Sequence, residues 1–93
     1  MRVRLSQRSA YHLNKIRAFL AGDNPEIAEL VRLRILATIE RLRTLPGLGH
    51  AGRKSGTREL RVTGLPFVVV YRVDIGDRDE LVILAVFHTA QDR

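Results

Sequence analysis

Three strand-like segments in the C-terminal part of the chain place the strongest constraint on its fold. They are residues 57–62 (TRELRV), 67–73 (FVVVYRV) and 80–88 (ELVILAVFH), which are rich in β-branched and aromatic residues. Their connections, TGLP and DIGDRD, have the composition of hairpin turns. Parallel neighbours need a crossover of roughly a dozen residues or more, so these segments must form an antiparallel meander.

Two helical stretches and a short strand precede the meander. The alternation in RVRLS, at residues 2–6, predicts a strand that joins the sheet. Residues 7–22 carry apolar side chains at helical spacing, and Gly22 is a suitable C-terminal stop. Asn24 and Pro25 suit the start of a second helix that runs to about residue 45. The tight AGDNP turn then makes the two helices an antiparallel hairpin.

The expected fold is therefore α+β, with an N-terminal strand, a two-helix hairpin and a three-stranded meander in a single domain of residues 1–93. Two helices cover one face of a four-stranded sheet, yet the last two strands are apolar on both faces. Either the loop at 46–56 covers the second face, or a partner does, along a strip that ends in Arg72 and His88. The alternative is that strong β-formers lie on a partly exposed sheet.

The positive charge is concentrated in two parts of the chain. The net charge is +6, with a pI near 11.0. Residues 1–22 carry five basic side chains and no acidic one, and residues 46–72 carry five basic side chains against Glu59 alone. Such a surface attracts phosphate backbones or an acidic protein partner. The alternative is that the charge serves solubility.

Several classes of protein are excluded by what the sequence lacks. Without cysteine there are no disulfides and no thiolate metal sites, which fits a reducing cytosol. No apolar run has the ~20 residues that span a bilayer, and no apolar segment of a signal peptide follows the N-terminal charges. His12, His50 and His88 lack metal-ligand spacing, and GLGHAG is not a phosphate-binding loop. No metal, cofactor or membrane is expected.

Four residues are candidates for chemistry or binding. His88 ends an apolar strand and is the best acid–base candidate, because histidine titrates near pH 6.5; the alternative is a structural role. Tyr71 and Arg72 can stack and bind phosphate, or be a core tyrosine beside a surface arginine. Arg58 is in phase with the apolar residues of its strand. A buried guanidinium needs a carboxylate or backbone carbonyls, so Arg58 either anchors a partner's acid or clamps the 46–56 loop.

The pattern GR..GTREL.V.G.PFVVVYRV, followed by ILAVFHTAQDR, resembles the RelE/ParE toxin superfamily of bacterial type II toxin–antitoxin modules. The resemblance covers nearly the whole chain and includes the order of elements. It implies a small cytoplasmic toxin that forms a hetero-oligomer with a cognate, ParD-like antitoxin. The antitoxin's C-terminal segment would fold along the toxin's surface, as disordered segments do on binding. It also implies a role in plasmid stabilisation and growth arrest.

The superfamily has two functional branches. The RelE-like branch cleaves messenger RNA on the ribosome and carries an arginine three residues before the strand tyrosine, where this chain has Val68. The RelE-like branch also carries a C-terminal cluster of basic or tyrosine residues. In this chain the residues after His88, Thr89 to Arg93, include only one basic residue and no tyrosine. Losing a central cation costs such a site on the order of 10²–10³ in rate. Arg53, Arg72 and His88 remain as a weaker catalytic set.

The ParE-like branch resembles the chain better, and it implies inhibition of DNA gyrase by binding rather than catalysis. No catalytic residue is then expected. Antitoxin or target binding is assigned to five residues: Arg53, Arg58, Tyr71, Arg72 and His88. The alternatives are a RelE-type endoribonuclease and a non-toxic basic module that binds a protein. Direct contact with nucleic acid is left open.

Overall fold

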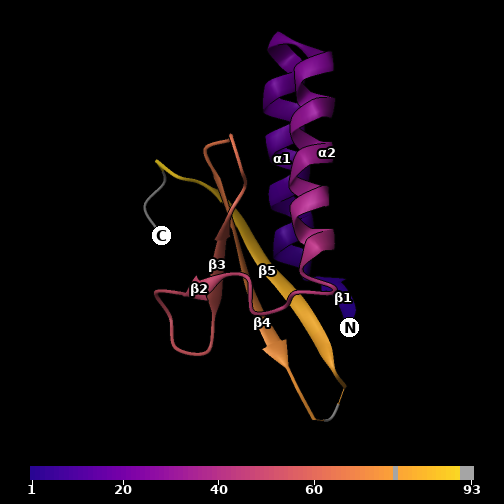
Figure 1. The fold of residues 1–93 in the computed structure, drawn as a ribbon. Coiled ribbons are helices and arrows are strands. Elements are labelled where there is room, and N and C mark those ends of the chain that lie inside the picture. The colour runs from indigo at the N-terminus through magenta and orange to yellow at the C-terminus, as the bar shows by residue number, and fades with distance from the viewer. Residues whose placement is uncertain (77, 91–93) are drawn as a thin grey trace.

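Within residues 1–76 and 78–90, which the computed structural model describes, the chain forms a five-stranded sheet with two helices against one face (Figure 1). The elements are β1 (Arg2–Leu5), α1 (Gln7–Asp23), α2 (Pro25–Arg41), β2 (His50–Ala51), β3 (Arg58–Arg61), β4 (Phe67–Asp74) and β5 (Glu80–His88). The strands lie in the order β1-β5-β4-β3-β2, with β1 parallel to β5 and the other neighbours antiparallel. The predicted α+β class, helical hairpin and antiparallel meander are confirmed.

The additional strand, β2, lies in the segment that the sequence predicts to be a loop. His50 pairs with Glu59, and Ala51 pairs with Arg58. A strand of two residues is too short to produce a hydrophobic period, so the sequence pattern does not reveal it. The pairing holds the connection between α2 and β3 against the edge of the sheet.

A single residue, Asn24, joins the two helices. Its backbone N–H donates to the carbonyl of Leu20 at 2.9 Å and ends α1. Its side-chain oxygen accepts from the N–H groups of Glu26 and Ile27, at 3.0 and 3.2 Å, and starts α2. The helix turn is therefore tighter than the predicted AGDNP turn, and α2 ends at Arg41 rather than near residue 45. Neither helix among the described residues is long and apolar enough to cross a membrane.

The core lies between the helices and the sheet, but the far end of the helical hairpin extends beyond it (Figure 1). Ile35, Leu42 and Tyr71 are fully buried at its centre. Apolar residues nearer the hairpin turn are exposed instead, with Phe19 77% and Leu30 61% accessible. The sequence places both in its apolar stripes. They lack a covering surface because the sheet does not reach that far.

A β-bulge in β5 changes which residues share a face of the sheet. Val70 pairs with Ala85 and Tyr71 with Ile83, so Leu84 is an extra residue in β5. His88 therefore lies opposite Phe67 on the helix side of the sheet, whereas Arg72, which pairs with Val82, lies on the other side. The predicted strip that contains both Arg72 and His88 is wrong for this reason.

Candidate functional site

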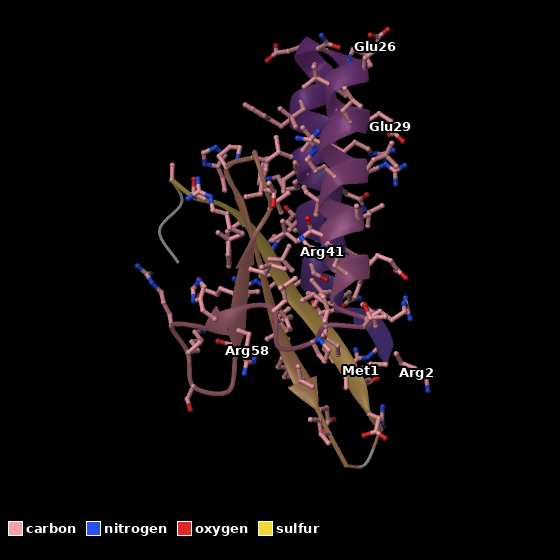
Figure 2. The ribbon with its side chains drawn as sticks, in the orientation of Figure 1. Met1, Arg2, Glu26, Glu29, Arg41 and Arg58 are labelled. Carbon is pink, nitrogen blue, oxygen red and sulfur yellow. The ribbon has the colours of Figure 1, made fainter. Side chains whose placement is uncertain are left out.

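The connection between α2 and β3 is fastened to the sheet through Gly49. The Tyr71 hydroxyl accepts a hydrogen bond from the Gly49 N–H and donates one to the Pro46 carbonyl, both at 2.8 Å. The Arg58 guanidinium donates to the Gly49 carbonyl at 2.6 Å. Tyr71 is fully buried, whereas Arg58 extends from β3 and is exposed (Figure 2). Of the two predicted roles of Arg58, the loop clamp is the one that these contacts form.

A second set of contacts shapes the turn between β2 and β3. Glu59 is only 6% exposed, and its carboxylate accepts from the backbone N–H of Arg53 at 3.2 Å. The Gly52 N–H donates to the Thr57 carbonyl at 2.8 Å, and the Thr57 hydroxyl donates to the Lys54 carbonyl at 2.6 Å. The turn is therefore held by hydrogen bonds from the backbone and from the Glu59 and Thr57 side chains, and Arg53 and Lys54 are exposed in it.

This basic turn borders a pocket of about 350 Å³ on the sheet face away from the helices, called here the sheet-face pocket. Arg53, Lys54 and Arg8 contribute its cationic lining. The Arg8 guanidinium lies 5.2 Å from the centre of the Phe87 ring, which also lines the pocket. Strand residues supply its apolar lining: Val70, Leu84, Ala85 and Phe87. The predicted covering of the second face by the 46–56 loop is thus partial, and the pocket stays open.

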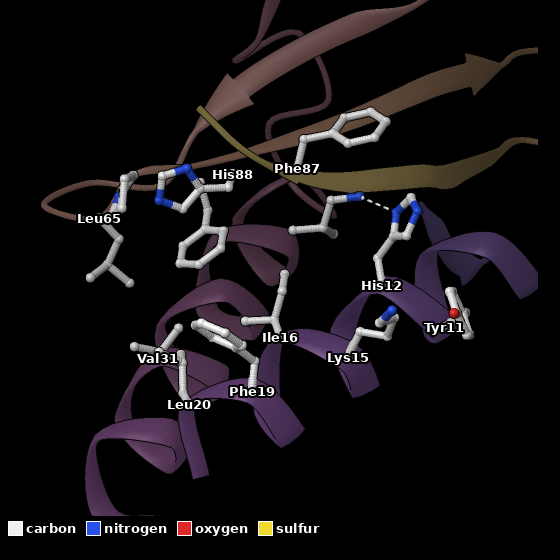
Figure 3. A pocket seen from close by; sticks show the side chains of 13 residues that line it. Tyr11, His12, Lys15, Ile16, Phe19, Leu20, Val31, Leu65, Phe87 and His88 are labelled. Carbon is white, nitrogen blue, oxygen red and sulfur yellow. Dashed lines mark hydrogen bonds between the residues drawn. The ribbon is translucent and has the colours of Figure 1, made fainter. Parts of the chain in front are cut away.

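A larger hollow of about 700 Å³ lies on the opposite side, between α1 and the ends of β4 and β5 (Figure 3). It is called here the helix groove. Its lining is mainly apolar and includes Ile16, Phe19, Leu20, Leu65 and Phe67. Because Phe19 is so exposed, the groove continues onto the uncovered end of the helical hairpin. Such a continuous apolar surface is typical of a protein-binding site.

His12 connects α1 to β5 at the edge of the helix groove. Its Nδ1 accepts a hydrogen bond from the Val86 N–H at 3.1 Å (Figure 3). An acceptor nitrogen carries no proton, so this bond requires the neutral ring. Burial and the nearby Arg8 charge lower the pKa of His12, in that order of importance. The His12 ring also lies 5.2 Å from the Phe87 ring.

The five predicted site residues do not form one cluster. Arg58 and Tyr71 are cross-strand partners at the Gly49 contact. Arg53 lines the sheet-face pocket, and His88 lines the helix groove, where its Nδ1 accepts from the Ala90 N–H at 3.0 Å. Arg72 lies on the same face as the pocket, 3.9 Å from Asp74.

The weaker catalytic set of Arg53, Arg72 and His88 is not brought together. Arg72 and His88 lie on opposite faces, and His88 pairs with Phe67, five positions from Arg72 along β4. That spacing corresponds to about 17 Å. The predicted C-terminal residues 91–93 lie outside the described residues. Among the residues that are described, no group of three or more His, Asp or Glu could hold a metal ion.

Four residues that shape these surfaces are not among the predicted site residues: Arg8, His12, Glu59 and Phe87. The alternation of β3 predicts that Glu59 and Arg58 point to opposite faces of the sheet. No local pattern indicates that the turn between β2 and β3 covers Glu59. His12 and Phe87 meet across 75 positions of sequence. Only the packing of α1 along β5 brings them together.

Comparison with known proteins gives one family for the chain. Residues 3–93 match the model of the ParE toxin of the type II toxin–antitoxin system parDE. A protein of Sinorhizobium fredii (strain NBRC 101917 / NGR234) described as "Putative toxin Y4kP" is 34% identical over 90 residues, which are 97% of this chain and 90% of that protein.

Two solved structures have a similar fold. A chain of the chromosomal ParDE toxin–antitoxin system from P. aeruginosa matches with a TM-score of 0.82 at 24% identity, covering 95% of both chains. A chain of the toxin–antitoxin complex RelBE2 from Mycobacterium tuberculosis matches with a TM-score of 0.60 at 25% identity, covering 94% of this chain and 95% of that one.

Proposed function

Because the chain belongs to the ParE toxin family of type II toxin–antitoxin systems, we propose that it binds DNA gyrase, stops replication and is neutralised by a cognate antitoxin. The observation that carries this proposal is the family match over residues 3–93. Growth arrest follows from stalled replication in the bacterial cytoplasm. Loss of the antitoxin after plasmid loss would release the toxin, which is how such a pair stabilises a plasmid.

Inhibition by binding is favoured over catalysis by the placement of the candidate residues. Phosphoryl-transfer sites stabilise developing charge with cations that converge on the reacting group. Arg72 and His88 lie on opposite faces of the sheet. Val68, at the position where the RelE-like branch carries its arginine, is only 8% exposed. A docking surface for a large enzyme needs none of these residues to converge.

The helix groove is the proposed antitoxin site. Its apolar lining and the exposed Phe19 offer surface that a disordered segment can bury as it folds. Two of the similar structures come from toxin–antitoxin systems, which supports a protein partner of this class. The antitoxin is expected to be ParD-like and to form a hetero-oligomer with the chain.

DNA supercoiling by purified gyrase tests the proposal most directly. Increasing amounts of the chain should reduce supercoiling and raise the amount of cleaved DNA bound to the enzyme, and added antitoxin should restore supercoiling. Supercoiling that continues unchanged at a large molar excess of folded chain would rule out gyrase as the target.

A ribosome-dependent endoribonuclease is the second candidate, favoured by the fold similarity to the RelBE2 complex. Messenger RNA on translating ribosomes should then be cut while supercoiling is normal. His88→Gln should reduce that cutting, because His88 is the remaining acid–base group of the set. If both assays are negative but the antitoxin still binds, the chain is a non-toxic binding module.

A further inference from the structure

The side of α2 that points away from the core carries a second row of apolar residues, called here the outer stripe. Leu30 and Leu33 are 61% and 49% exposed, and Ala37 is exposed as well. Spacings of three and four residues place these three side chains next to one another on a helix. Buried residues of α2, such as Ile35, lie on the opposite side. The fold therefore covers one apolar stripe of α2 and leaves the other exposed.

The outer stripe ends in opposite charges. Glu26 lies four positions before Leu30, and Arg41 lies four positions after Ala37, so both continue the stripe along the helix (Figure 2). Neither Glu26 nor Arg41 forms an ion pair with another described residue. The stripe is therefore negative at the hairpin turn and positive at its other end.

The other charged residues beside the two ends are already paired. Glu29 forms an ion pair with Arg32, and Glu40 forms one with Arg43 at 2.8 Å. Each of these pairs is neutral as a unit. The net charge at each end of the outer stripe is thus set by the one residue that is unpaired there.

A second copy of the stripe, in antiparallel orientation, complements the first. Leu33 lies seven positions from Glu26 and eight from Arg41. A two-fold axis near Leu33 therefore places each Glu26 beside the partner's Arg41, over a helix length of about 22 Å. The same axis packs the leucines of the two copies against each other. A parallel arrangement would instead bring like charges together at both ends.

Arg34 is the charged residue nearest to that axis, and its side chain points elsewhere. Its Nη1 lies 3.4 Å from the position that a Cβ on Gly64 would take, so the guanidinium is directed at the turn between β3 and β4. The two copies of Arg34 therefore do not bring like charges together at the centre of the contact.

The outer stripe is separate from the helix groove. Among the described residues of α2, only Val31 lines the groove, and Val31 belongs to the buried side of the helix. An antitoxin segment in the groove thus leaves the outer stripe exposed. The matched opposite charges at its ends fit a second copy of the chain, because one surface then supplies both halves of each ion pair.

We propose that α2 is a dimerisation surface, on which a second copy of the chain packs in antiparallel orientation through Leu30, Leu33 and Ala37. Glu26 and the partner's Arg41 form an ion pair at each end. A contact along one helix lies at the low end of interface sizes, so the dimer exchanges with the monomer. The proposal does not rest on gyrase or the ribosome being the target.

Sedimentation equilibrium of the full chain over a series of concentrations tests the proposal. Leu33→Asp places a carboxylate near the two-fold axis and should raise the dissociation constant of the dimer at least ~10-fold. Ile75→Asp is the control with the same change of charge, because Ile75 is 77% exposed in the turn between β4 and β5. It should leave the dissociation constant unchanged.

Charge reversal tests the orientation of the two helices. Glu26→Arg alone and Arg41→Glu alone each create like-charge contacts at both ends, and each should weaken self-association about 5- to 10-fold. An equimolar mixture of the two variants regains both ion pairs and should associate about as strongly as the wild type. Recovery in the mixture cannot come from altered folding, since it uses the same two chains.

Two results together support the proposal: a weaker dimer in Leu33→Asp but not in Ile75→Asp, and recovery in the mixture. A wild type that stays monomeric at about 1 mM, an equal loss in both aspartate variants, or a mixture without recovery would overturn it. A monomeric wild type whose antitoxin affinity falls in Leu33→Asp would also overturn it and assign the stripe to the antitoxin. Gyrase inhibition is measured separately, so the two proposals fail independently.

Discussion

Arg58 and Tyr71 face each other across β3 and β4, and together they bond both backbone groups of Gly49. The tyrosine hydroxyl accepts a hydrogen bond from the Gly49 N–H, and the guanidinium donates one to the Gly49 C=O. A glycine in a connecting segment is thus held as firmly as a residue in a sheet ladder. The basic turn that contains Arg53 and Lys54 begins only three residues later. The anchored Gly49 therefore fixes where this turn lies against the sheet.

Removing the Tyr71 hydroxyl should destabilise the fold. Tyr71→Phe leaves the Gly49 N–H and the Pro46 carbonyl without this partner at a buried position. The expected loss is about 1–3 kcal/mol in the free energy of unfolding, measured by urea denaturation. Tyr11→Phe is the matched control, because Tyr11 is 59% exposed, and it should change stability little. Equal stability of the two variants would contradict the role of the hydroxyl.

Adding one methyl group at Gly49 should also be costly. A Cβ there would lie 2.7 Å from the Tyr71 hydroxyl and 2.8 Å from the Glu59 carbonyl oxygen. The backbone of β3 cannot move away without losing its pairing, so Gly49→Ala should cost about 1–3 kcal/mol. Gly47→Ala meets nothing within 4 Å and is the control. Thermal melting of the two variants measures the difference, and a Gly49→Ala protein that melts with the wild type would refute the close contact.

His12 should make stability depend on pH. Its pKa is lowered in the folded state, so the unfolded chain binds a proton more readily. The stability that neutral His12 contributes is fully present above the unfolded pKa of about 6.5, and it is lost as the pH falls from there through the folded pKa. Protonation also removes the acceptor of the Val86 N–H.

The His12 contribution is measured as the difference between wild type and His12→Gln in urea denaturation. Near pH 8 the wild type should be the more stable protein, and its advantage should shrink below about pH 6. Other groups titrate in both proteins and cancel in the difference. An advantage that stays constant across this range would show that His12 does not titrate in the folded protein as its burial implies.

The exposed end of the helix groove should contribute to antitoxin binding. Phe19→Asp removes an apolar side chain that is 77% exposed in the free chain, so its folding should be unaffected. The affinity for the antitoxin, measured by calorimetry, should fall by about 10- to 100-fold. Ile75→Asp is closely matched, since Ile75 is also 77% exposed but lies in the turn between β4 and β5. A similar loss in both variants would argue against the groove.

The local patterns of this chain account for most of its elements. The cap at Asn24, the apolar periods of the helices and the short turns between the last three strands each depend on residues that are close together in the sequence. The ParE family assignment follows from the same run of residues that carries the strands. The faces of the candidate site residues do not follow from local patterns, because one extra residue, Leu84, places His88 on the helix side of the sheet.

The amino-acid sequence by itself determined the order and type of the elements, the family and the unequal distribution of charge, because each of these depends on neighbours along the chain. The tertiary structure alone decided that Arg58 holds Gly49, that Glu59 is buried under the basic turn, and that α1 places Arg8 and His12 next to the Phe87 ring. The contacts of Arg8 and His12 with Phe87 join residues far apart in sequence, whereas those of Arg58 and Glu59 span only nine and six positions. Their geometry depends on strand register and on the β5 bulge, which no local pattern specifies.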